Sequence, residues 1–158
     1  MALLRGTLSH IHSTPAESAL LAAVLRSCES LMAYRRGYSS APELIPALAL
    51  LLLNETNPRA LVFQLAALER HLAALPRDTN AAQLSEESRS VLETATTVRL
   101  SDLNQLAAAD PDGKLRPNLD QLLVRIDQLL RRASDALVSD YFTDSRGPQQ
   151  LIGTDPPP

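Results

Sequence analysis

The chain has 158 residues, a net charge of −3 and a pI near 5.6, and charges of both signs are scattered along it. A chain of this length fits one domain with a single core, and the absence of a basic patch argues against nucleic acid as a partner. Leu and Ala supply most of the apolar share of 45%, whereas aromatic residues contribute 3% and Trp is absent. This composition favours helices.

The same sequence predicts a cytoplasmic protein. Its longest unbroken apolar run, residues 47–53, is far shorter than the roughly 20 residues of a membrane-spanning helix. The N-terminal string "MALLRGTLSH" lacks the long apolar region and cleavage pattern of a signal peptide. Cys28 is the single cysteine, so it forms no intramolecular disulfide and fits a buried thiol in a reducing compartment.

The first long helix is predicted over residues 15–36. Thr14, Pro15 and Glu17 form a helix-start pattern, in which a hydroxyl and a carboxylate satisfy the first free amides. Apolar residues then recur at three- and four-residue spacing until Gly37 offers a stop. These residues are Leu20, Leu21, Val24, Leu25, Cys28, Leu31 and Met32.

The next two helices are predicted around the string "NETNP". Residues 44–53 carry no polar side chain on any face, so a helix there should be buried all round. After the string, Asn57 is expected to cap a third helix, with Pro58 at its first position and Pro76 as its stop.

Two more helices complete the predicted fold. One begins after a capping Ser85 and runs to about Leu106, and a strongly amphipathic one spans residues 119–142. Residues 143–158 are polar and rich in Pro and Gly, which predicts a disordered tail. Because no segment alternates with period two, we expect an all-α domain over residues 1–142, an antiparallel up-and-down bundle of about five to six helices.

Three strings resemble a known family: "LMAYRRGY", "LALLLLNETNPRALVFQLAALERHLAALP" and "ASDALVSDYF". Together they are similar to the C-terminal half of the alpha-E domain family, most closely over residues 31–76 and again over 119–142. Members are all-helical bacterial proteins found beside, or fused to, circularly permuted ATP-grasp proteins. The resemblance therefore implies a working context of peptide synthesis or modification, with an ATP-grasp ligase-type protein as partner.

The chain also departs from that family. Gly37 stands where members usually carry a third arginine or a similar residue, and members commonly have an acidic residue near Asn54. Family members are considerably longer and begin with glutamate-bearing helices, so "MALLRGTLS" resembles the end of a helix that starts elsewhere. We therefore expect a fragment or the tail of a fusion, whose bare apolar face would pack against the missing N-terminal helices or against a second copy in a homodimer.

One group of candidate binding residues is Tyr34, Arg35, Arg36 and Tyr38. Arginine offers a planar fork of donors and tyrosine a hydroxyl, so the group could clamp an anion or a partner carboxylate. The alternative, which we favour, is that the arginines complement the negative end of the helix dipole while the tyrosine rings pack. Adjacent helical residues point about 100° apart, which disfavours a shared small ligand.

A second group is Asn54, Asn57 and Arg59 with Pro58. These residues could present a recognition loop, because free amides at a helix start attract anions. The alternative, again favoured, is a tight interhelical turn capped by Asn57.

No residues indicate catalysis, a metal or a cofactor. His10 and His12 make at best half a metal site, and Asp110 and Asp112 with Gly113 lack the later ligands of a calcium loop and fit a turn better. Nucleophile elbows and phosphate-binding glycine loops are also missing. The sequence thus predicts a non-catalytic interaction or accessory domain; the alternative is an anion-binding module or an enzyme that uses the corner at residues 34–36.

Overall fold

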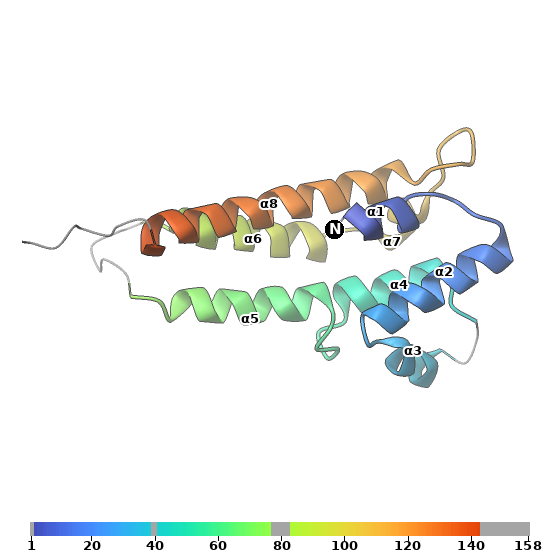
Figure 1. Ribbon diagram of the computed structural model, residues 1–158, viewed down its shortest axis with the longest axis horizontal. Helices are drawn as coiled ribbons and strands as arrows, with labels where there is room; N and C mark the ends of the chain where they lie inside the picture. Colours follow the sequence, from blue (N-terminus) through green and yellow to red (C-terminus); the bar gives the residue numbers. More distant parts are fainter. Residues whose placement is uncertain (1, 39–40, 77–82, 143–158) are drawn as a thin grey trace, which may run out of the picture.

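The computed structural model describes residues 2–38, 41–76 and 83–142, and these form helices joined by short loops (Figure 1). The elements are α1 (Ala2–Leu8), α2 (Thr14–Ser27), α3 (Leu31–Gly37), α4 (Leu44–Leu48), the π-helical turn η1 (Ala49–Leu53), α5 (Leu61–Ala73), α6 (Glu86–Arg99), α7 (Leu103–Ala107) and α8 (Pro117–Phe142). Within these ranges no strand forms beyond an isolated bridge between His10 and Leu115. The all-helical prediction is confirmed, with more and shorter helices than the five to six expected. The predicted tail, residues 143–158, lies outside the described residues.

The long helices lie roughly parallel to the long axis of an elongated molecule (Figure 1). α6 packs against both α8 and α5, and the chain reverses direction from α5 to α6 and again from α6 to α8, as an up-and-down bundle requires. The first half departs from this pattern. There α4 with η1 and then α5 follow one another in the same direction, so the loop that contains Asn57 joins consecutive helices without folding the chain back.

The core follows the helical periodicity of the sequence. α8 buries one face of the kind expected for a 3.6-residue repeat, made of Leu119, Leu122, Leu123, Ile126, Leu129 and Ala133. α6 buries Val91, Ala95 and Val98 completely against it. Since burying a whole Val, Leu or Ile side chain contributes about 1.5–3 kcal/mol, this pair of helices is a major source of stability.

The N-terminal helix is fastened to the start of α8 by Arg116. This buried guanidinium donates to the carbonyl oxygens of Leu8 (3.1 Å) and His10 (3.0 Å), and it also pairs with the carboxylate of Glu17. Satisfying a buried charge in this way offsets its desolvation. α1 is thereby held where Leu8 joins the core.

The predicted helix over residues 15–36 is wrong, because the chain turns between α2 and α3. Glu29 adopts a left-handed backbone conformation with φ of 52°. The amide of Glu29 donates to the Arg26 carbonyl at 3.0 Å and that of Ser30 to the Leu25 carbonyl at 2.8 Å. This is the Schellman pattern that ends helices, here with Glu where Gly is usual. Helical structure begins at Thr14 and α3 ends at Gly37, close to the predicted limits. The predicted chemistry at these ends does not form, because Ser13 is the N-cap without a side-chain capping bond and Glu17 pairs with Arg116 instead. Gly37 itself belongs to α3.

Two further predictions are corrected by the structure. The helix expected from residue 85 to 106 is divided, because Asp102 caps a separate α7 by accepting from the amides of Asn104 (2.8 Å) and Gln105 (3.3 Å). Residues 44–53 are not buried all round, since Ile45 is 39% exposed and Leu51 is half-buried. An all-apolar helix can therefore lie at the edge of a small domain, where it leaves apolar surface uncovered.

The string with the two aspartates forms a turn, as predicted. The Asp110 carboxylate accepts from the backbone amides of Leu115 (3.0 Å) and Lys114 (2.7 Å), and these two bonds lower the pKa of Asp110. Gly113 takes φ of 67°, which glycine adopts without steric cost.

Candidate functional site

Of the residues at the end of α3, only Tyr34 is fully buried. Its hydroxyl accepts a hydrogen bond from the Glu43 amide at 3.0 Å, and its ring lies 4.9 Å from that of Tyr38, centroid to centroid. Tyr34 therefore holds the segment before α4 against α3. Its hydroxyl is engaged within the fold.

Arg35 and Arg36 are exposed on the same short helix. Neither makes an ion pair or side-chain hydrogen bond with any other residue that the structure describes. Their position in the last turn of α3 suits the negative end of the helix dipole, as the sequence predicted. Whether they bind an anion stays a prediction.

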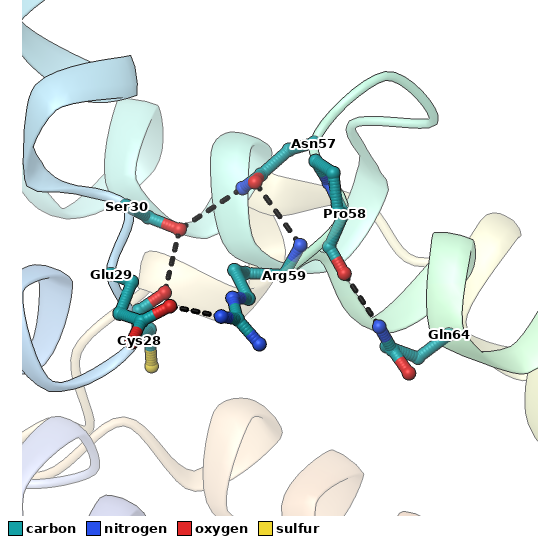
Figure 2. Close-up of polar contacts among 7 residues, drawn as sticks. All are labelled: Cys28, Glu29, Ser30, Asn57, Pro58, Arg59 and Gln64. Carbon is teal, nitrogen blue, oxygen red and sulfur yellow. Dashed lines mark hydrogen bonds and ion pairs between the residues drawn. The ribbon is translucent and has the colours of Figure 1, made fainter.

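Asn57 is the centre of a buried polar junction, shown in Figure 2. Its side-chain amide donates to the Ser30 hydroxyl and to the Leu50 carbonyl, each at 3.1 Å. Its side-chain oxygen accepts from the Arg59 amide, also at 3.1 Å. Leu50 belongs to the last turn of η1, where carbonyls lack a helical partner, so Asn57 satisfies a group that burial would otherwise penalise.

The prediction that Asn57 caps the third helix is wrong. α5 begins at Leu61 after an extended Ala60, so Pro58 also lies outside the helix. The reason is that the turn is closed earlier by Asn54, whose side-chain oxygen accepts from the amides of Thr56 (2.8 Å) and Asn57 (3.0 Å). Asn57 is then free to link the loop to η1 and to the turn before α3.

Arg59 lies at the solvent side of this junction. Its guanidinium pairs with the carboxylate of Glu29, and both side chains are more than half exposed, at 55% and 67%. Such a pair contributes about 0–1 kcal/mol. Beside it, the Gln64 amide donates to the Pro58 carbonyl at 2.6 Å (Figure 2).

The structure thus links the predicted residues Asn57, Arg59 and Pro58 to three residues outside the predicted groups: Ser30, Glu29 and Gln64. Glu29, Ser30 and Gln64 were not predicted as site residues. Gln64 lies inside the string that resembles the family, whereas no local motif marks Ser30, which is 27 positions from Asn57. The corner at Tyr34 and the Asn57 junction lie at opposite ends of α3. No hydrogen bond or ion pair joins Arg35 or Arg36 to the other candidate residues in the described part of the chain.

Most of this chain matches one family of known proteins. Residues 1–142 match Alpha-E, described as a predicted alpha-helical domain with a conserved ER motif. The chain belongs to the Alpha-E family. The all-helical structure agrees with that description.

Relatives of this Alpha-E domain include uncharacterized proteins from Mycobacterium bovis and Mycobacterium tuberculosis. Each is 36% identical to it over 154 residues, which are 98% of this chain and 17% of the relative. The chain therefore spans about 17% of the length of these curated relatives. No solved structure matches it.

Two common features are absent from the part of the Alpha-E domain that the structure describes, a metal-ligand cluster and a membrane-spanning helix. The described residues contain no group of three or more His, Cys, Asp or Glu side chains that could hold a metal ion. None of the helices within those ranges is both long and apolar enough to cross a bilayer.

Proposed function

We propose that this Alpha-E domain is a non-catalytic interaction or accessory module that works with an ATP-grasp peptide ligase-type protein. The proposal rests on how this chain aligns with its relatives, which are much longer. Nearly the whole chain, 98%, aligns with only 17% of much longer polypeptides. A domain of this kind packs beside other domains, and the resemblance of the strings around residues 31–76 supplies the ATP-grasp context.

The state of the candidate polar residues supports a non-catalytic role. A general acid, base or nucleophile must reach a substrate atom within hydrogen-bond distance. The side chain of Asn57 instead makes three bonds inside the fold, and the hydroxyl of Tyr34 makes one. These groups are engaged in holding helices together.

The end of α8 offers a surface on which a protein partner could pack. Val138 and Phe142, four residues apart on one helix face, are 53% and 79% exposed, and Tyr141 beside them is 37% exposed. Aromatic side chains such as Tyr141 and Phe142 are enriched at the centres of interfaces.

Co-purification with an ATP-grasp protein encoded beside this chain would test the proposal. We expect a stable complex in size-exclusion chromatography that Val138→Ser with Phe142→Ser weakens by about tenfold. Leu100→Ser is the matched control, because Leu100 is 79% exposed on a different helix end. The absence of any complex at concentrations of tens of micromolar would contradict the proposal.

The corner at Tyr34 to Arg36 remains the second candidate function, an anion-binding or enzymatic site. It is favoured by the exposure of Arg35 and Arg36 without partners in the described residues. A screen of nucleotides and amino acids would test it, and saturable micromolar binding lost in Arg35→Ala or Arg36→Ala would replace our first proposal.

A further inference from the structure

A cavity of about 220 Å³ lies beside the Asn57 junction, where residues of α1, α2, α4, η1, α5 and α8 meet. Its interior is formed by side chains that are buried and apolar: Leu8, Val24, Leu48, Leu52 and Leu123. Two polar residues that are exposed, Arg59 and Gln64, also line it and therefore mark its opening to solvent. An apolar interior with a few polar groups at the mouth is the usual form of a small-molecule site.

The size of the cavity sets the size of its occupant. An engineered apolar cavity of about 150 Å³ in another protein stays dry and binds benzene. A cavity of about 220 Å³ therefore has room for an apolar group as large as benzene or slightly larger. A water molecule gains nothing among leucine side chains, because it needs polar partners.

The polar side chains at the opening indicate which polar group the ligand carries. Arg59 presents a planar fork of donors that matches a carboxylate, and its present partner, Glu29, holds it only through an exposed ion pair (Figure 2). A carboxylate at the end of an apolar tail can therefore replace Glu29 at little cost. Gln64 beside it has an amide for a further hydrogen bond.

We propose that this cavity binds small monocarboxylic acids with an apolar tail, with the tail among the leucines and the carboxylate on Arg59. The site is separate from the corner at Tyr34, and the proposal does not rest on the interaction role above. It predicts that the acid binds better than the alcohol of equal length.

Cys28 makes the proposal directly measurable. It is the single cysteine of the chain, it is half-buried, and it lines the cavity. A ligand in the cavity should shield its thiol, so the rate of labelling by a maleimide reports occupancy at this place alone. The probe is hexanoate, a carboxylate with about as many carbons as benzene, and 1-hexanol is its neutral counterpart.

We expect hexanoate to slow the labelling of Cys28 in a saturable manner, at a concentration lower than 1-hexanol requires. Arg59→Gln should raise the half-protecting concentration of hexanoate by about tenfold and leave that of 1-hexanol unchanged. Glu29→Gln should lower the half-protecting concentration of hexanoate, because the substitution removes the competing carboxylate. Arg131→Gln, a charge change on an exposed face of α8, should alter neither.

Two results would overturn the proposal. Unchanged labelling of Cys28 at saturating hexanoate would show that the cavity does not admit the acid. Equal protection by hexanoate and 1-hexanol, or no response to Arg59→Gln in a variant whose circular dichroism matches the parent, would show that Arg59 does not bind the carboxylate.

Discussion

Replacing Asn57 with alanine should destabilise the domain more than any other single polar substitution in the loop between η1 and α5. The side chain is 7% exposed and makes three hydrogen bonds, each 3.1 Å long, to Ser30, Leu50 and Arg59. Alanine removes all three. It also leaves the Leu50 carbonyl buried without the donor that satisfied it.

The expected magnitude follows from these contacts. A typical intramolecular hydrogen bond contributes about 1 kcal/mol net, and a buried group left unsatisfied costs about 1–3 kcal/mol. Some of these costs overlap, because water can enter the space that the amide vacates. We therefore expect Asn57→Ala to lower the free energy of unfolding by about 3 kcal/mol.

Urea unfolding followed by circular dichroism measures this loss, provided that the slope with denaturant is unchanged. Asn118→Ala is the matched control. Asn118 is exposed and its amide donates one bond, to the Gln105 carbonyl at 3.0 Å, so its loss should cost less than about 0.5 kcal/mol. If Asn57→Ala were as stable as Asn118→Ala, the junction would not hold η1 against the turn before α3.

Three other predictions concern the core, the response to pH and association. Leu50→Asp or Leu52→Asp should unfold the domain, because these side chains are 5% and 7% exposed, whereas Leu100→Asp, at a site 79% exposed, should keep the parent's melting temperature. Turn amides hold the folded pKa of Asp110 below its unfolded value, so the ionised carboxylate contributes stability that is present above about pH 4 and is lost as pH falls through the folded pKa. Urea midpoints of Asp110→Asn and of the parent should therefore converge in acid. Light scattering at several concentrations should show a symmetric dimer, and a single species at the 17.1 kDa chain mass would contradict this.

The helical class and the course of the longest helices could be predicted from the residues alone. The repeats in α5, α6 and α8 place apolar side chains at three- and four-residue spacing. Such side chains line up on one face only in a helix, and that face is stable when it is buried in a core. The helix limits near Thr14 and Gly37 could also be read from the sequence to within about a residue, although the capping bonds predicted there do not form.

The break between α2 and α3 was not readable. The apolar repeat continues across Glu29, and nothing in the residue type announces a left-handed backbone there, where Gly is the usual choice. The break at Asp102 had a local signal, a capping carboxylate, but the apolar repeat around it outweighed that signal in the prediction.

The role of Asn57 was decided only by the tertiary structure. The sequence offered a local partner, the start of the next helix, and an Asn before a Pro commonly caps in this way. In the fold, η1 ends with a carbonyl that needs a donor, and Ser30 lies beside it although it is 27 positions away. The cost of leaving buried polar groups unpaired selects the partner, and which groups are buried together depends on how the helices pack.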